Sequence, residues 1–84
     1  MARFIWDAEN RAHIARHGVT PAEFEQAYAT RGILRQALAG ERRKIAFGAT
    51  RAGRILVIVY TMRRGRVRAI TAYESRKARR EWRS

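Results

Sequence analysis

The sequence predicts an α+β domain in which a small, mainly antiparallel sheet carries two N-terminal helices and a basic C-terminal helix. Two observations lead to this prediction. A helix-capping motif opens residues 20–32, and beyond Gly40 the spacing of apolar residues changes from a helical period of about 3.6 to a strand period of about 2. The expected order of elements is β-α-α-β-β-β-α, in a single domain that spans residues 1–84.

The first expected elements are a short strand at Phe4-Ile5-Trp6 and a helix that runs to about His17. Asp7 suits the N-cap, and Glu9 places an acid in the first turn, where the helix dipole favours negative charge. Gly18 suits the left-handed residue that ends many helices. A stripe of small residues on this helix is expected to pack close to a neighbour: Ala8, Ala12 and Ala15.

The second helix has the clearest start in the chain. Thr20 is its expected N-cap, Pro21 suits the first helical position, and Glu23 completes a capping box. Val19 and Phe24 have the spacing of a hydrophobic staple. This helix is expected to end near residue 32, with an apolar face made of Phe24, Ala27 and Tyr28.

Three strands are expected next. Alternation over residues 43–47 predicts the first, and Thr50–Gly53 resembles a hairpin loop. Residues 54–62 are apolar on both faces after the first residue, which indicates the central strand. A second turn at residues 63–65 leads to the last strand, Val67–Tyr73.

A final basic helix is expected over Arg76–Trp82. Ser75 is its expected cap, and Ala78 and Trp82 have the spacing of two anchoring residues on one face.

The formal net charge of +12 lies entirely in the second half of the chain. Residues 1–41 carry five basic and five acidic side chains, whereas residues 42–84 carry fourteen basic side chains against only Glu74 and Glu81. This asymmetry predicts a polyanionic partner, and RNA is the expected one. Seventeen of the nineteen basic residues are arginine, which is typical of a GC-rich genome and also suits bidentate binding of phosphate.

Composition excludes several other classes of protein. Cysteine is absent, so disulfides and thiolate metal sites are excluded. Asp7 interrupts the N-terminus before an apolar signal region forms, and the longest apolar run, residues 55–60, is too short to span a bilayer. We therefore expect a cytoplasmic protein with no membrane partner.

His13 and His17 are the only histidines, and they share one helix face with Asn10. A metal site there lacks the glutamate of a zinc-protease helix and an evident third ligand. Two other roles are open. The imidazoles could bond to the backbone or to tyrosines beneath the helix, or they could act as general acid and base near neutral pH.

The acidic residues offer no paired site. Glu41 is the only acid at the edge of the predicted sheet and is a candidate base, whereas the other acids of the first half suit caps or helix surface. The chain has no glycine-rich phosphate loop, nucleophile elbow or cysteine nucleophile, so nucleotide hydrolysis and acyl transfer have no support.

Arginines and tyrosines gather on the three predicted strands of the second half. They form either a solvated basic face over core tyrosines or a groove in which guanidinium groups bind phosphates and rings stack on bases. RNA can be cleaved in such a groove without a metal, because its own 2′-hydroxyl attacks the phosphorus and the protein supplies a base, an acid and fixed positive charge. The residues concerned are Arg43, Arg54, Tyr60, Arg63, Arg66, Arg68 and Tyr73.

These residues belong to a longer pattern that resembles the BrnT family, the toxins of type II toxin–antitoxin pairs. The matching segments of the first half are Phe4-Ile5-Trp6-Asp7, His13-Ile14 and His17-Gly18-Val19. Those of the second half are Glu41, Arg43, Gly48, Gly53-Arg54, Leu56, Val57–Tyr60, Thr61, Arg63, Arg68, Ile70-Thr71-Ala72 and Arg79-Arg80-Glu81-Trp82. The chain departs from the family at Tyr73, where many members carry Arg, at Asn10, where Lys is common, and at Ala78, where Glu is frequent.

The resemblance implies a RelE-like fold and RNA cleavage that inhibits translation. Because the sequence offers no evident cluster of carboxylates, histidines or thiolates to hold a divalent ion, we expect a metal-independent endoribonuclease with no cofactor. The resemblance also implies a BrnA-like, ribbon-helix-helix antitoxin that joins the toxin in a hetero-oligomer. The catalytic residues expected from residues and resemblance together are Arg63, Arg68, Tyr73 and His17. The expected RNA-binding residues are Arg43, Arg54, Arg66, Arg76, Arg79 and Arg80. The alternative is a non-catalytic RNA- or DNA-binding module, or a degenerate toxin that acts through its antitoxin complex.

Overall fold

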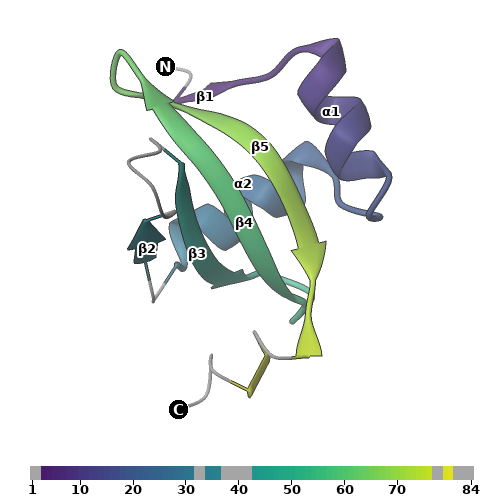
Figure 1. Cartoon of the computed structure of the whole chain (residues 1–84). Coiled ribbons are helices and arrows are strands. Elements are labelled where there is room, and N and C mark those ends of the chain that lie inside the picture. The colour runs from purple at the N-terminus through teal and green to yellow at the C-terminus, as the bar shows by residue number, and fades with distance from the viewer. Residues whose placement is uncertain (1–2, 32–33, 37–42, 77–78, 81–84) are drawn as a thin grey trace.

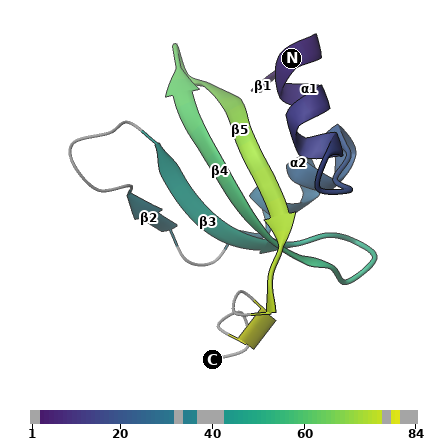
Figure 2. The ribbon, with the colours of Figure 1, turned by 45° about the vertical axis from the view of Figure 1, so that its right-hand side comes forward.

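The described part of the chain contains one curved sheet and the two helices α1 and α2 (Figure 1). The computed structural model describes residues 3–31, 34–36, 43–76 and 79–80, and of residues 34–36 only the backbone. Figure 2 shows α2 on one side of the sheet and α1 beside β5. In the described part of the chain no helix covers the opposite side, which we call the open face.

The sheet of the described residues has five strands in the order β1-β5-β4-β3-β2. β1 pairs in parallel with β5, and the other neighbouring strands pair antiparallel. The α+β class and the central place of the fourth strand confirm the sequence prediction. The strands are β1 (Phe4–Ile5), β2 (Leu34–Gln36), β3 (Lys44–Ala49), β4 (Ile55–Arg63) and β5 (Arg66–Glu74).

One part of the predicted order needs correction, and another is described only in part. β2 was not predicted, because a three-residue strand is too short to show an alternating pattern of apolar residues. It is recognised as a strand only by its hydrogen-bonded pairing with β3. The expected C-terminal helix is seen only in part. Arg76, Arg79 and Arg80 have helical backbone, and the Arg79 N–H donates to the Ser75 carbonyl at 3.0 Å. The two expected anchors of that helix, Ala78 and Trp82, lie outside the described residues.

Helix α1 (Ala8–Ala15) begins as the sequence predicts and packs differently. The Asp7 carboxylate caps the helix by accepting from the Asn10 backbone N–H at 2.9 Å. In return, the Asn10 side-chain oxygen accepts from the Asp7 backbone N–H. The Asn10 amide also donates to the Ile5 carbonyl at 2.9 Å, which joins the helix to β1. The buried face is Asn10 and Ile14. The expected contact through the alanine stripe is therefore wrong, since Ala8, Ala12 and Ala15 are all exposed.

Helix α2 (Pro21–Ala29) has the predicted capping box of Thr20 and Glu23. Val19 and Phe24, the predicted staple, are both buried. The apolar face confirms its prediction, because Phe24, Ala27 and Tyr28 enter the main core. The helix ends at Ala29, earlier than expected, where the Thr30 hydroxyl exchanges hydrogen bonds with the backbone of Ala49 and so joins the helix end to β3.

A β-bulge in β5 decides which side chains share the open face. The pairing of β4 with β5 shifts between Val59 and Tyr60, where Ile70 is the extra residue. On the two sides of this bulge, Arg68 pairs with Thr61 and Tyr73 with Val57. Because directly paired residues point to the same face, the bulge brings Arg68 and Tyr73 to one face although their sequence numbers differ in parity.

The same register determines which face of the sheet each of the two tyrosines of the predicted groove lies on. Tyr60 faces the helices and is 2% exposed, and this burial raises its pKa. It is therefore a core residue and cannot stack on RNA. Tyr73 lies on the open face and is 39% exposed. Next to it, Phe47 and Val57 form a smaller apolar cluster on that face.

Gly48 is the position at which the sheet and α2 come closest. A Cβ atom built on Gly48 would overlap the backbone carbonyl of Ala27, so only glycine fits. We expect Gly48→Ala to lower the free energy of unfolding by about 3 kcal/mol or more, measured by urea denaturation. Gly53→Ala is the control. Its site is open and only the left-handed φ of 89° is strained, so it should cost about 1 kcal/mol. Equal losses in the two variants would contradict this close approach.

Candidate active site

Basic side chains crowd the tip of the β4–β5 hairpin. Arg63 and Arg66 pair directly across it, and Arg64 and Gly65 between them both have positive φ, at 51° and 78°. Two positive φ values define a type I′ turn, for which Asn-Gly is the preferred sequence. Like charges directly opposite destabilise a strand pair. The arginines therefore make this hairpin less stable than a neutral sequence would, which is typical of a surface that binds an anion.

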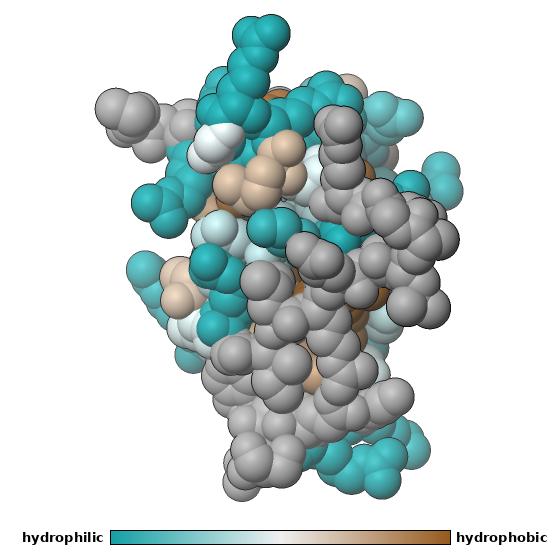
Figure 3. Space-filling view, turned by 60° about the vertical axis from the view of Figure 1, so that its left-hand side comes forward, coloured by the Kyte–Doolittle hydropathy of each residue, from teal (hydrophilic) through white to brown (hydrophobic). Residues whose placement is uncertain are grey.

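The described acidic residues lie elsewhere, at the starts of the two helices, within α2 and at the end of β5. Among the described residues the salt bridges involve only Arg54 and Arg68 as cations, and none involves the hairpin arginines. In Figure 3, hydrophilic side chains project from the upper end of the molecule, where Figure 1 places the hairpin. The structure thus separates the charges of the chain, and the hairpin end is strongly basic.

Arg68 is paired within the chain. Its guanidinium lies 2.6 Å from the Asp7 carboxylate and 3.7 Å from that of Glu9, and its side chain is 19% exposed. The hydrogen bond from the Asn10 backbone N–H lowers the pKa of Asp7 most, and the hydrogen bond from Arg68 lowers it further. The pair therefore joins the first turn of α1 to β5, and two carboxylates offset the charge of an arginine expected to be catalytic.

His17 and Tyr73 meet at the opposite end of β5. Their ring centroids lie 6.0 Å apart, and the rings are tilted by 54°. The His13 ring lies 6.0 Å beyond that of His17. All three side chains are exposed. One of the two expected roles placed the histidines beneath the helix, and their exposure does not fit that role. An imidazole and a phenol side by side at the surface can transfer protons to and from a bound molecule.

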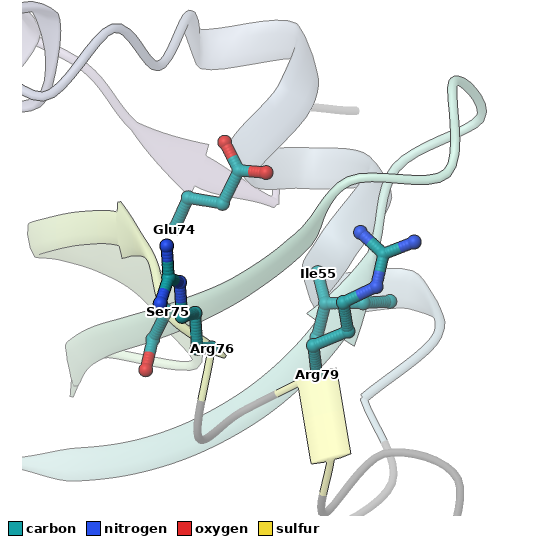
Figure 4. A pocket seen from close by; sticks show the side chains of 5 residues that line it. All are labelled: Ile55, Glu74, Ser75, Arg76 and Arg79. Carbon is teal, nitrogen blue, oxygen red and sulfur yellow. The ribbon is translucent and has the colours of Figure 1, made fainter.

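A cavity of about 250 Å³ lies just beyond Tyr73, where β5 ends and β4 begins. Arg76 and Arg79 contribute its positive charge, and Glu74 contributes one carboxylate (Figure 4). Both arginines are exposed as well as lining the cavity, so a bound group could reach their guanidinium groups from solvent. The lining residues are Ile55, Glu74, Ser75, Arg76 and Arg79.

The expected catalytic residues thus fall into two groups. Arg63 and Arg68 lie toward the hairpin, whereas His17 and Tyr73 lie near the cavity. Tyr73 lies five residue steps along β5 from Arg68, which corresponds to roughly 16 Å of extended strand. One phosphate cannot touch both groups, although one RNA strand could.

Arg54 is engaged with the protein rather than with solvent. Its guanidinium donates to Glu23 at 2.7 Å, to the Gly18 carbonyl at 3.0 Å and to Glu74 at 3.2 Å. Partial burial opposes ionisation of Glu23, but the Thr20 backbone N–H and Arg54 outweigh it, and the pKa of Glu23 is lowered. No local pattern in the sequence indicates this contact, since 31 residues separate Arg54 from Glu23.

The remaining expected residues lie at the two ends of the sheet. Arg43 is exposed immediately before β3, toward the hairpin end, and Arg80 is exposed at the cavity end. The candidate base Glu41 lies outside the described residues. Within the described ranges, no three His, Asp or Glu side chains form a group that could hold a metal ion. Neither of the described helices has the length and apolar character of a membrane span.

The fold and the charge of the open face define a small, basic α+β protein of the kind that acts on nucleic acid. The family model for the ribonuclease toxin BrnT of type II toxin–antitoxin systems matches residues 6–81. The chain therefore belongs to the BrnT family of ribonuclease toxins, a class whose members have an RNA substrate and a protein antitoxin.

A solved structure supports the fold. The crystal structure of the ribonuclease toxin BrnT of Brucella abortus is similar to this chain with a TM-score of 0.69 and 22% sequence identity, over 89% of this chain and 97% of that one. No curated protein matches the chain.

The ion pair of Asp7 and Arg68 predicts a pH dependence of stability. The folded pKa of Asp7 lies below its ordinary value of 3.8, so its contribution to stability is complete above that value and is lost as pH falls through the folded pKa. Asp7→Asn keeps a capping side chain and removes the charge. In urea unfolding, we expect this variant to be less stable than the native chain at about pH 7, and the difference should shrink as the pH falls below 3.8. A difference that stays constant with pH would contradict the role of the charge.

Proposed function

We propose that this chain is a metal-independent endoribonuclease toxin that inhibits translation by cutting RNA in the cytoplasm. The observation that carries the proposal is the exposed contact between His17 and Tyr73 at the end of β5, where the next residue, Glu74, lines a cavity together with Arg76 and Arg79. This end of the sheet combines two proton-transferring groups with two fixed positive charges, which is the set that cleavage by an internal 2′-hydroxyl requires.

In the proposed step, the 2′-hydroxyl oxygen forms a bond to the adjacent phosphorus and the bond from phosphorus to the 5′-oxygen breaks. His17 takes the proton of the 2′-hydroxyl, and the Tyr73 phenol gives a proton to the leaving 5′-oxygen. Arg76 and Arg79 stabilise the additional negative charge of the transition state. Because arginine does not lose its proton in proteins, these two residues supply charge and not proton transfer.

The hairpin end has a separate role in this proposal. Arg63 and Arg66 bind backbone phosphates of the same RNA some distance from the bond that is cut, and Arg43 extends this contact toward β3. Arg68 forms ion pairs with the carboxylates of Asp7 and Glu9, and its role is to hold α1 in place beside β5. A phosphate placed between Arg63 and Arg66 would remove their mutual repulsion, which is the physical support for binding there.

The proposed protein partner is a BrnA-like antitoxin of the ribbon-helix-helix class. The described acids are engaged with partners within the chain, and none of them pairs with a hairpin arginine, so the hairpin end is left basic. An antitoxin segment rich in carboxylates complements that surface and would compete with RNA for it.

Cleavage should survive EDTA and should leave 2′,3′-cyclic phosphate and 5′-hydroxyl ends, because no step uses a metal. We expect Tyr73→Phe, which keeps the ring and removes the hydroxyl, to lower kcat on the order of a hundredfold. His17→Asn should have an effect of similar size. The measurement is cleavage of total cellular RNA by the purified chain, with the ends identified by mass spectrometry.

Loss of cleavage in EDTA would contradict metal independence, and unchanged rates in both variants would remove the site from this end of the sheet. RNA binding with no cleavage at all would favour a non-catalytic binding module. Circular dichroism of each variant distinguishes a lost catalytic group from a lost fold.

Binding of RNA should weaken steeply with salt, since each phosphate contact releases counterions. We expect Arg63→Gln to raise the Kd for a single-stranded RNA and to reduce the slope of log K against log salt by about 0.7 for the lost phosphate. kcat should change little. Arg11→Gln, an exposed arginine on α1, is the matched control and should leave the slope unchanged. A reduced kcat with an unchanged slope would place Arg63 in the chemical step instead.

A further inference from the structure

Arg54 connects three separate parts of the chain through one guanidinium. Nη1 donates to Glu23 at the start of α2 and to the Gly18 carbonyl in the turn between the helices. Nε donates to Glu74 at the end of β5. Along the chain, Gly18 is 36 residues from Arg54, Glu23 is 31 and Glu74 is 20, so the guanidinium joins segments that are distant in sequence.

The backbone of Arg54 is itself fixed. Its N–H donates to the Thr50 hydroxyl at 3.0 Å, and its carbonyl accepts from the Thr50 N–H at 2.9 Å. Thr50 is 6% exposed, and Gly53 with its φ of 89° closes the turn between them. The guanidinium therefore extends from a rigid base, and this gives its three contacts a defined geometry.

Two of the three acceptors are sequence neighbours of the proposed catalytic rings. Gly18 follows His17, and Glu74 follows Tyr73. Those rings come from elements that share no strand pairing, since His17 lies in the turn after α1 and Tyr73 lies on β5. A group that bonds to the residue after each ring fixes the distance between them, which is 6.0 Å between centroids.

We propose that Arg54 is a positioning residue that holds His17 against Tyr73, an inference that rests on the proposed function. It touches neither ring and no reacting atom. It acts through Gly18 and Glu74, while Glu23 holds the guanidinium in place.

The chemistry of arginine explains why this residue type is needed. Its planar guanidinium presents several N–H donors in diverging directions, so it can reach three acceptors at once. A lysine ammonium could replace the charge, but its flexible stem and compact head do not reproduce that geometry. The carboxylates of Glu23 and Glu74 also offset the charge of Arg54, which makes it a poor ligand for RNA phosphate compared with Arg63 or Arg66.

Arg54→Gln tests this role against a direct role in RNA binding. We expect kcat to fall on the order of a hundredfold, because small displacements of reacting groups have effects of that size. KM and the salt dependence of RNA binding should change by less than about twofold, since no phosphate contact is lost. Arg54→Lys should restore only part of kcat. Arg51→Gln, an exposed arginine in the same turn, is the control and should behave as the native chain.

The contact between the rings is the second readout, and it does not depend on activity. In the native chain, nuclear Overhauser effects should connect the ring protons of His17 and Tyr73; they should weaken strongly in Arg54→Gln and remain in Arg51→Gln. If Arg54→Gln does not fold, Glu74→Gln replaces it. That side chain is 52% exposed, and its loss should weaken the same effects without unfolding the chain.

The outcomes separate the two proposals. A raised KM and a reduced salt slope, with the ring contact intact, would show that Arg54 binds RNA and would overturn its positioning role. Unchanged kcat and unchanged ring contact would overturn it as well. If the native chain does not cleave RNA, the proposed function fails, and the Overhauser effects still decide whether Arg54 holds the two rings together.

Discussion

The guanidinium of Arg54 lies where four parts of the chain come together: the β3–β4 turn, the turn after α1, the start of α2 and the end of β5. Each part has its own local stabilisation, such as the Thr20 capping box and the strand register. Arg68 joins the first turn of α1 to β5, but no strand pairing links the turn after α1 to the far end of β5. The bonds of Arg54 to the Gly18 carbonyl and to Glu74 link these two parts, while Glu23 holds the guanidinium at 2.7 Å, and the proposed relation of His17 to Tyr73 follows from those bonds.

The second organising feature is the separation of charge. Asp7 and Glu9 contact Arg68, Glu23 and Glu74 contact Arg54, and Glu25 accepts from the Trp6 indole, so every acid in the described ranges has a partner within the chain. The hairpin arginines have no such neighbour among those acids. This arrangement uses acids to hold the helices on the sheet and leaves cations at the hairpin end, which gives one small domain both a stable interior and a surface for a polyanion.

Local sequence patterns predicted the local structure well. The caps at Asp7 and Thr20, the left-handed glycines and the central apolar strand each depend on residues close in sequence, and the structure has them as predicted. The site could be predicted only in part, because its geometry depends on contacts between distant residues. The bulge at Ile70 changes which residues share a face, the burial of Tyr60 depends on the register of β4, and the ion pair of Arg54 joins residues 31 positions apart. The family resemblance correctly indicated the toxin family, yet resemblance could not show that Arg63 and Tyr73 lie at opposite ends of the paired strands β4 and β5.

The central claim is that RNA is cut at the His17–Tyr73 end of β5 while the hairpin end holds the strand. The most direct test is the chemical-shift map of the isotope-labelled chain with a 2′-O-methyl oligoribonucleotide, which binds but lacks the attacking hydroxyl. The account predicts shift changes at both ends of the strand, with His17, Tyr73, Arg76 and Arg79 among the residues that change most. Shift changes confined to the hairpin and Arg68, with the rings of His17 and Tyr73 unaffected at saturation, would contradict it.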